Sequence, residues 1–417
     1  MGSELDKCVR CGACRQVCPV FKTSRLERDS ARGKLSLIRA CSKGDLPLTP
    51  VFRKSIDHCI LCLNCVSNCS NNVRVDRIIL AARARFKTSR GLPLWKTAAF
   101  WSLRNPKRVD CLLKSGSIAQ TLFFKALPDD TGLKLRFPLS PVSKPSYVPA
   151  ITRRPFRNRN LKTVQWDTAR DSVTFFTGCM TNYIFPALGE AVLKVMAALE
   201  IHVTIPEEQK CCGAPAKTSG DTPTATLLAR HNINCLFAAD KTSCIIVPCA
   251  SCGYMLKTVY PDLFASDPEM SAMAKQLSDN VFEITEYLVK RVGLEAVSHQ
   301  LKSSATRKIT YHDPCHLRCG MGVISEPRDI LKLVAGKNFT EMEDADQCCG
   351  SGGLFRVNHP ETARLIFDSK SRHIKQSRAE IIATGCPACM MQLRNESRNR
   401  NISIHTAHPI EILAAHL

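Results

Sequence analysis

The spacing of its cysteines limits what this chain can fold around more than any other feature of the sequence. The chain has 23 cysteines in 417 residues, and most of them stand in four regularly spaced groups. Reducing cytosol disfavours disulfides, and an odd number of cysteines cannot be fully paired, so metal binding is the better explanation. The N-terminus has no apolar leader segment. We therefore expect a cytoplasmic metal-binding protein.

Two four-cysteine motifs with the same spacing lie in the first 70 residues. They read C-x2-C-x2-C-x3-C and consist of Cys8, Cys11, Cys14 and Cys18, then Cys59, Cys62, Cys65 and Cys69. In this spacing three thiolates hold one [4Fe–4S] cluster and the fourth reaches the other cluster. The spacing therefore predicts cluster 1 on Cys8, Cys11, Cys14 and Cys69, and cluster 2 on Cys59, Cys62, Cys65 and Cys18.

The second motif departs from the usual pattern at one position. Ser70 stands where a proline normally follows the fourth cysteine. Because that residue is not a ligand, we expect the cluster to be retained. The alternative, zinc, would need four-cysteine sets with wider loops between the pairs.

From residue 171 onward the chain is an internal repeat with an interval of 136–137 residues. The copies contain Cys179, Cys211, Cys212, Cys249 and Cys252, and then Cys315, Cys348, Cys349, Cys386 and Cys389. A glycine, Gly213 or Gly350, follows each adjacent pair, which suits a close backbone approach to a bulky group. Two adjacent cysteines do not easily chelate one zinc ion, but they reach two different irons of a cluster. Each copy therefore predicts a metal site.

The pattern of apolar residues predicts an α+β multidomain fold with four segments. Residues 1–90 are expected to form a helical two-cluster ferredoxin domain, with helices near residues 30–41 and 75–88. Residues 91–170 are expected to hold amphipathic helices, broken at Pro106, and a linker rich in Pro and Arg. Residues 171–300 and 301–417 are expected to be two duplicated α/β cysteine-rich domains.

Each cysteine-rich copy alternates between strand-like and helical patterns. The expected strands are residues 173–176, 245–247, 308–311 and 381–383, and the expected helices are 187–199 and 328–334. Such alternation predicts a sheet with cysteines at the carboxyl ends of its strands, where α/β sheets place their ligands.

The net charge of +21 raises the question of a nucleic-acid partner. A [4Fe–4S] cluster with four thiolates carries a charge of about −2, so four clusters would cancel roughly eight of these positive charges. The basic residues show no regular interleaving with aromatic ones, so we expect no nucleic-acid binding. No run approaches the roughly 18 apolar residues of a membrane span. The sequence contains no nucleotide-binding glycine fingerprint in the proper context. We therefore expect that the chain itself does not hold flavin or NAD.

The residues around the repeat cysteines resemble a known family. The segments are Thr177-Gly178-Cys179, His312-Asp313-Pro314-Cys315-His316, Cys348-Cys349-Gly350-Ser351-Gly352-Gly353 and Thr384-Gly385-Cys386-Pro387-Ala388-Cys389. They resemble the cysteine-rich CCG domains of heterodisulfide reductases. The domain order resembles the iron–sulfur subunits of glycolate oxidase, the lactate-oxidation subunits and the heterodisulfide reductase D subunit. The stretch from Ala31 to Leu35 also matches that family, and the resemblance covers nearly the whole chain.

The resemblance implies further cofactors. In such domains the five cysteines of a copy hold a [4Fe–4S] cluster of non-cubane form. One or two further clusters are therefore expected at the two repeat sites, with zinc as the alternative at one of them. His312, Asp313 and His316 flank a site cysteine and are interpreted either as groups that tune the site or as a capped turn. Cys319 is a candidate spare ligand.

The resemblance also implies a function. It is that of an electron-transfer subunit in a flavin-dependent oxidoreductase for 2-hydroxy acids such as glycolate or D-lactate. The implied partners are an FAD-containing dehydrogenase subunit and a quinone or another membrane electron acceptor, with peripheral contact to the inner face of the cell membrane. The alternative is a heterodisulfide reductase-like subunit that reduces a disulfide at non-cubane clusters. A metal-binding scaffold is a third interpretation. No catalytic residue is assigned.

Overall fold

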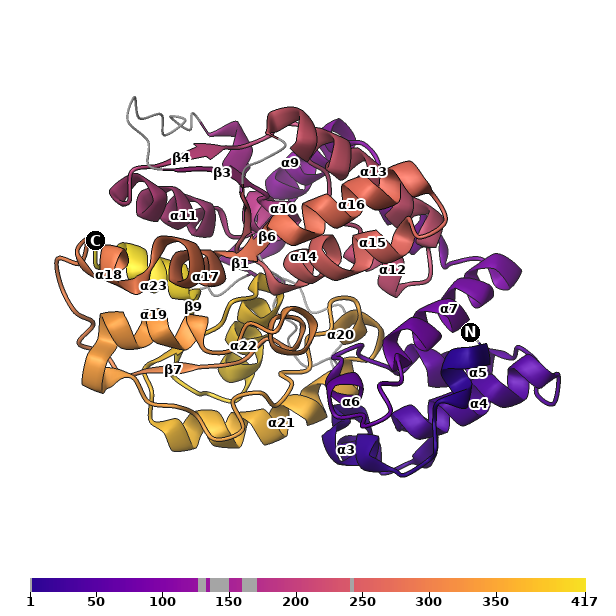
Figure 1. The fold of residues 1–417 in the computed structure, drawn as a ribbon. Helices are drawn as coiled ribbons and strands as arrows, with labels where there is room; N and C mark the ends of the chain where they lie inside the picture. Colours follow the sequence, from indigo (N-terminus) through magenta and orange to yellow (C-terminus); the bar gives the residue numbers. More distant parts are fainter. Residues whose placement is uncertain (1, 127–132, 136–149, 160–170, 241–243) are drawn as a thin grey trace.

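The computed structural model describes residues 2–126, 133–135, 150–159, 171–240 and 244–417 (Figure 1). Its N-terminal unit consists of short helices packed around Ile38, Ile56 and Ile79. The helices are α1 (Gly2–Asp6), α2 (Ala13–Val17), α3 (Pro19–Ser24), η1 (Glu27–Asp29), α4 (Ala31–Lys43), α5 (Pro50–Asp57), α6 (Asn64–Ser67) and α7 (Val75–Arg90). The helical fold expected for this unit, and the two helices expected within it, are confirmed.

Helix α4 begins and ends at residues suited to those positions. The Ser30 hydroxyl caps its N-terminus by accepting a hydrogen bond from the Gly33 N–H (2.9 Å), and Gly44 ends it in the left-handed conformation. A side chain at Gly33 would lie 1.9 Å from the Glu27 carbonyl oxygen. Glycine therefore lets α4 lie directly against η1, which brings α4 between the two cysteine motifs.

Two helices follow the N-terminal unit, α8 (Leu94–Leu103) and α9 (Pro106–Phe123). The Asn105 side chain accepts from the Lys107 N–H and Pro106 opens α9, so the break expected at Pro106 is confirmed. A short antiparallel pair, β1 (Phe124–Ala126) and β2 (Leu133–Leu135), comes next. Of the expected linker, residues 136–149 and 160–170 lie outside the described residues. The described part is packed, because Phe156 in η3 (Phe156–Asn158) is completely buried.

The two repeats form two parallel sheets with the same strand order. The first sheet has the order β4-β3-β5-β6, and the second has the order β7-β8-β9. A parallel bridge from Ile309 in β7 to Phe339 takes the place that β4 has in the first sheet. The strands are β3 (Asp171–Phe175), β4 (Ile201–Thr204), β5 (Cys244–Val247), β6 (Val281–Glu283), β7 (Ile309–Tyr311), β8 (Ile381–Ala383) and β9 (His405–Ala407). The duplicated α/β fold is confirmed, and β4, β6 and β9 are strands that the sequence patterns did not reveal.

Helices cover both sheets. In the first repeat they are α10 (Gly178–Tyr183), α11 (Pro186–Ala198), α12 (Ala214–Thr218), α13 (Thr222–Ala239), α14 (Ala250–Tyr254), η4 (Met255–Val259), α15 (Tyr260–Leu263), α16 (Pro268–Asn280), α17 (Ile284–Tyr287), η5 (Leu288–Val292) and α18 (Leu294–Ser298). In the second they are η6 (His316–Met321), α19 (Glu326–Ala335), η7 (Gly336–Asn338), α20 (Phe355–Asn358), α21 (Pro360–Ser377), α22 (Pro387–Asn399) and α23 (Pro409–Ala415). The helices expected at 187–199 and 328–334 are α11 and α19.

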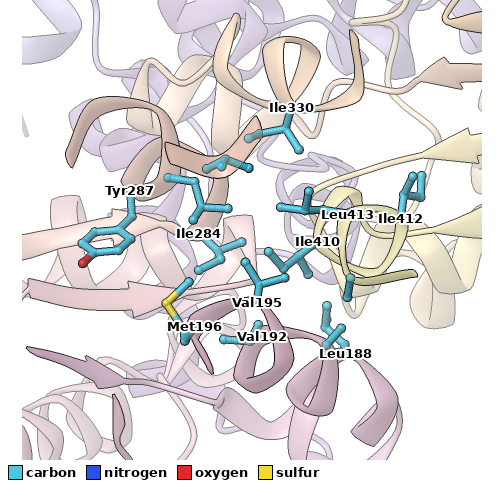
Figure 2. Close-up of a cluster of buried hydrophobic side chains, with 14 of the residues drawn as sticks. Leu188, Val192, Val195, Met196, Ile284, Tyr287, Ile330, Ile410, Ile412 and Leu413 are labelled. Atoms are coloured by element: carbon cyan, nitrogen blue, oxygen red, sulfur yellow. The ribbon is translucent and has the colours of Figure 1, made fainter. Parts of the chain in front are cut away.

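The two repeats share one hydrophobic core (Figure 2). Helix α11 of the first repeat packs against α23 of the second, and α19 of the second packs against α17 of the first. Leu188 and Val192 on α11, Ile284 on α17, and Ile410 and Leu413 on α23 are all completely buried. Because helices of each repeat pack against helices of the other, the two repeats form a single packed body. Among the described residues, no helix has the length and apolar character needed to span a membrane.

Candidate metal centres

The eight cysteines of the N-terminal unit line two cavities on either side of α4. One cavity is lined by Cys8, Cys11, Cys14 and Cys69, and another by Cys18, Cys59, Cys62 and Cys65, each with about 30 Å³ of free space. Ala31 on α4 lines both cavities, and Cys65 reaches both. The structure thus brings the fourth cysteine of each motif to the other motif. Which thiolates bind which cluster stays a prediction.

The cavities differ in their access to solvent. Cys11 in the first cavity is exposed, whereas Cys62 in the second is buried. Arg32 borders the first cavity and Lys34 the second. Since a [4Fe–4S] centre with its thiolates is anionic, these cations suit it electrostatically. The stretch from Ala31 to Leu35 that resembles the family is therefore the segment between the two centres.

In the first repeat the five cysteines lie together under the ends of β3 and β5. Cys179, Cys211, Cys212, Cys249 and Cys252 are packed in one cluster of mostly buried side chains. The Cys252 sulfur lies 3.4 Å from the Cys212 sulfur. Hydrogen bonds from the Cys211 and Cys252 thiols lower the pKa of Cys212 to about 6. The site therefore holds at least one thiolate at neutral pH, which is the form that binds metals.

In the second repeat the cysteines gather in the corresponding place. A hydrogen bond from the Cys389 thiol holds the pKa of Cys349 well below its ordinary value. Hydrogen bonds from Cys249 and Cys389 do the same for the pKa of Cys386. Cys348 and Cys315 complete this group, and Cys315 feels the charges of Cys348, Cys349 and Cys386. All ten predicted repeat cysteines are thus brought into two groups.

The two repeat sites touch each other through their closing Cys-x2-Cys segments. The Cys249 thiol hydrogen-bonds to Cys386 across the boundary. The backbone supports this contact, because the Ala250 N–H donates to the Gly385 carbonyl (3.1 Å) and the Ser251 hydroxyl lies 3.8 Å from the Cys386 sulfur. The sequence treats the sites as two separate copies, and only the fold makes them neighbours.

The second cavity of the N-terminal unit adjoins the second repeat. Burial raises the pKa of Cys62 well above normal, and the neighbouring Cys348 and Cys315 thiolates raise it further. The glycine run after Cys349 permits this approach, since a side chain at Gly352 would lie 2.3 Å from Ile60. In the first repeat the corresponding position is Pro215, and that repeat instead approaches the N-terminal unit at Gly220, where a side chain would lie 2.5 Å from the Arg83 carbonyl group on α7.

The three polar residues around Cys315 have different roles. His312 lies beside Cys349 and Cys389 inside the second site. Asp313 accepts a bidentate pair of hydrogen bonds from Arg328 (2.9 and 2.7 Å), which is a structural role. His316 joins three parts of the chain: its Nε2 lies 3.0 Å from the Leu61 carbonyl oxygen and its Nδ1 lies 3.3 Å from the Ser251 hydroxyl.

Cys319, the candidate spare ligand, lies at the boundary with the N-terminal unit. Its thiol donates to the Asn64 side-chain oxygen on α6 (3.5 Å). It lies close enough to Cys315 for its charge to raise the pKa of that thiol. The hydrogen bond to Asn64 gives Cys319 a structural role at this boundary.

The first repeat site also opens to a pocket that sequence reasoning missed. This pocket, with about 20 Å³ of free space, is lined by Cys179 and Cys211 together with Arg157, Lys210 and Tyr183. Arg157 is held by the carbonyls of Glu207 and Gln209 (2.6 and 2.8 Å). Two cations therefore lie beside two site cysteines, around a space that holds about one water molecule. No spacing pattern links residue 157 to the cysteines, because the contact depends on where the chain enters β3.

A buried acid–base pair lies between the repeats, close to their closing segments. The carboxylate oxygen Oε1 of Glu283 and Nε2 of His408 are 3.7 Å apart, and both side chains are completely buried. The residues are counterparts, because each one caps a helix after the last strand of its repeat. Burial raises the pKa of Glu283 to about 8 and lowers the pKa of His408 to about 3. Glu283 is therefore largely protonated at neutral pH.

The Glu283→Gln variant is expected to lose part of the pH dependence of stability. The folded-state pKa of Glu283 lies above its unfolded value of about 4.5, so its contribution is complete below pH 4.5 and is lost as pH rises through 8. Between pH 5 and 8 the wild type should lose roughly 4 kcal/mol more unfolding free energy than the variant. Urea unfolding at several pH values measures this difference. Parallel pH profiles for the two proteins would contradict it.

The donor set fits iron–sulfur chemistry. All four groups present cysteine sulfur, and the second repeat site adds a histidine nitrogen. Soft sulfur donors select iron–sulfur clusters or zinc over magnesium and calcium, which require oxygen ligands. Five thiols per repeat exceed the four ligands of a structural zinc ion.

Comparison with known proteins gives two kinds of match. Residues 4–73 match the family described as "4Fe-4S dicluster domain", and residues 173–257 and 309–394 both match the family described as "Cysteine-rich domain". The chain is 30% identical to the probable glycolate oxidase iron-sulfur subunit of Bacillus subtilis (strain 168), over 98% of this chain and 93% of that protein. It is 31% identical to lactate utilization protein A 2 of Bacillus cereus (strain Q1), over 58% of this chain and 97% of that protein. Lactate utilization protein A 1 of Bacillus anthracis (strain CDC 684 / NRRL 3495) is 30% identical over the same shares.

Proposed function

We propose, since this chain belongs to the family of glycolate oxidase iron–sulfur subunits and lactate utilization A proteins, that it carries electrons within a 2-hydroxy-acid oxidoreductase complex. In this proposal an FAD-containing dehydrogenase subunit oxidises glycolate or D-lactate. The chain accepts the electrons singly and passes them to a quinone or another carrier. When bound, [4Fe–4S] clusters supply this one-electron chemistry.

The observation that carries the proposal is the unbroken order of the cysteine groups through the molecule. The first cavity has the exposed Cys11, and Cys65 links it to the second. Cys62 in the second cavity adjoins Cys348 of the second repeat. Cys386 there touches Cys249 of the first repeat, whose Cys179 is partly exposed. Four centres in this order would join two separate points on the surface.

The ligand sets follow from the same groups. Cluster 1 would be held by Cys8, Cys11, Cys14 and Cys69, and cluster 2 by Cys18, Cys59, Cys62 and Cys65. The repeat sites would be held by Cys179, Cys211, Cys212, Cys249 and Cys252, and by Cys315, Cys348, Cys349, Cys386 and Cys389. Non-cubane clusters at these two sites, or zinc at one of them, belong to this proposal, as does the division at residues 1–90, 91–170, 171–300 and 301–417.

The electron-transfer function is tested with the anaerobic complex of the chain and its flavin-containing partner. Addition of glycolate or D-lactate is expected to bleach the visible iron–sulfur absorbance of the chain, and a quinone should restore it. A chain that dithionite reduces, but that neither acid reduces in the complex, would contradict the proposal.

The pocket beside Cys179 favours one second candidate, a disulfide reductase. Its cations Arg157 and Lys210 would bind an acidic disulfide next to two site cysteines. Reduction of one disulfide consumes two electrons and two protons and releases two thiols. Anaerobic incubation of the dithionite-reduced chain with a small acidic disulfide, after removal of excess dithionite, decides this point. Thiol release that Cys179→Ser abolishes would support the candidate, and release equal to a protein-free control would exclude it.

A further inference from the structure

The two repeats differ at one position that faces their metal sites. Phe176 in the first repeat and His312 in the second follow β3 and β7 directly, and they stand 136 residues apart, as the following cysteines do. Their backbones are equivalent: the Phe176 N–H donates to the Ile246 carbonyl (3.0 Å) and the His312 N–H donates to the Ala383 carbonyl (2.9 Å). Both side chains are buried, at 0% and 1% exposed. Phe176 packs against the cysteines of the first site.

The imidazole of His312 lies among the cysteines of the second site. One ring nitrogen of His312 and the sulfurs of Cys349 and Cys389 lie within 4.8 Å of one another. A phenyl ring at this position fills space, whereas an imidazole offers a lone pair to a metal. The second site therefore has a nitrogen donor where the first has an apolar ring.

The other side of the ring is already fixed in the way that a metal ligand requires. His312 Nδ1 lies 3.2 Å from the Ala345 carbonyl oxygen, which also accepts from the Lys370 ammonium (2.8 Å) and the Asp313 N–H (3.0 Å). A carbonyl oxygen only accepts, so Nδ1 must carry the proton in this contact. In the neutral ring Nε2 then keeps its lone pair. Metal-bound histidines usually donate their second N–H to a carbonyl or carboxylate in this manner.

We infer that His312 is a metal ligand of the second repeat site, together with Cys349 and Cys389. The second site is thus a mixed nitrogen–sulfur site, and the first is bound by sulfur alone. The metal is an iron of a cluster or a zinc ion, both of which accept imidazole. This inference rests on the proposed function, because it requires that the second repeat site holds metal.

The second site also has more positive charge around it than the first. Lys370 is completely buried near the second site, and Arg356 lies close enough to interact with Cys349. The corresponding positions in the first repeat, 137 residues earlier, are Ile233 and Ser219. Two nearby cations favour the reduced form of a cluster, because reduction adds negative charge to it. If both sites hold clusters, the second should have the higher reduction potential.

The test compares variants of the full-length chain purified anaerobically, with natural-abundance or ¹⁵N-labelled histidine. His312→Leu removes the donor, and His312→Cys replaces it with a sulfur donor. His373→Leu is the matched control, because His373 lies in the same repeat but faces Glu343 and Asp344. Metal analysis counts iron and zinc in each protein. Pulsed EPR detects histidine nitrogen bound to paramagnetic iron, and X-ray absorption at the zinc edge detects nitrogen bound to zinc.

The wild type and His373→Leu should show a histidine-nitrogen coupling that changes with ¹⁵N, or a zinc shell with one nitrogen. His312→Cys should keep the metal and lose the nitrogen signal. His312→Leu should lose about four irons or one zinc per chain, with the signals of the N-terminal clusters unchanged. An all-sulfur second site, a second site without metal, or an unchanged nitrogen signal in His312→Leu would each overturn the inference. None of these results depends on whether a hydroxy acid reduces the chain, so a failure of the proposed function is recognised separately.

Discussion

The Cys62→Ser variant is expected to lose about four irons per chain, one complete cluster, and to stop electron passage into the second repeat. Cys62 lines the second cavity of the N-terminal unit and is buried beside Cys348 and Cys315. Serine is a much poorer iron ligand than a thiolate, because iron–sulfur clusters select soft sulfur donors. Iron and sulfide analysis with EPR of the reduced protein measures the loss.

A matched control is available in the same unit. Cys41 is also buried, but it lies in the hydrophobic core and lines neither cavity. Cys41→Ser should retain the iron content of the wild type at a small cost in stability. In the complex with the flavin partner, Cys62→Ser should leave cluster 1 reducible while the repeat sites stay oxidised. Full iron content, or normal reduction of the repeat sites in Cys62→Ser, would show that Cys62 is not on the route.

The Leu413→Ala variant is expected to reduce the free energy of unfolding by about 2–5 kcal/mol. Leu413 on α23 is completely buried in the core that joins α11 of the first repeat to α17 and α19 (Figure 2). Its removal leaves a cavity at the boundary of the two repeats, so both should melt together and earlier. For a unit of this size the melting temperature should fall by roughly 5–15 °C. Differential scanning calorimetry of anaerobic protein measures the shift and the number of transitions.

Leu365→Ala provides the comparison. Leu365 on α21 is 53% exposed, so its truncation should change stability by less than about 0.5 kcal/mol. If Leu413→Ala left a separate transition of the first repeat at the wild-type temperature, the shared core would not couple the repeats. A change as small as that of Leu365→Ala would contradict the role of Leu413 in this core.

Much of the fold could be predicted from local patterns. The serine and glycine at the two ends of α4, and the proline that opens α9, act within one or two turns of their own helix. Strands β3, β5, β7 and β8 are apolar runs directly before cysteines, so their place was also evident. Strands β4, β6 and β9 are as short as β5, β7 and β8, but they mix polar with apolar residues and lead into no motif cysteine. Pairing with a neighbouring strand decides their conformation, so local patterns did not identify them.

The candidate sites divide in the same way. Within each N-terminal motif, gaps of two residues place the thiols close together whatever the rest of the chain does, so the sequence by itself determined where those centres would form. The repeat likewise determined the two five-cysteine groups. The contacts between groups are different, because Cys62 and Cys348, or Cys249 and Cys386, are far apart in the chain. Only the tertiary structure decided that these residues meet. The physical reason is that the contacts that hold the groups together act between segments distant in the chain. These contacts are the packing of α11 against α23 and the close approach of the backbone at Gly352 to Ile60.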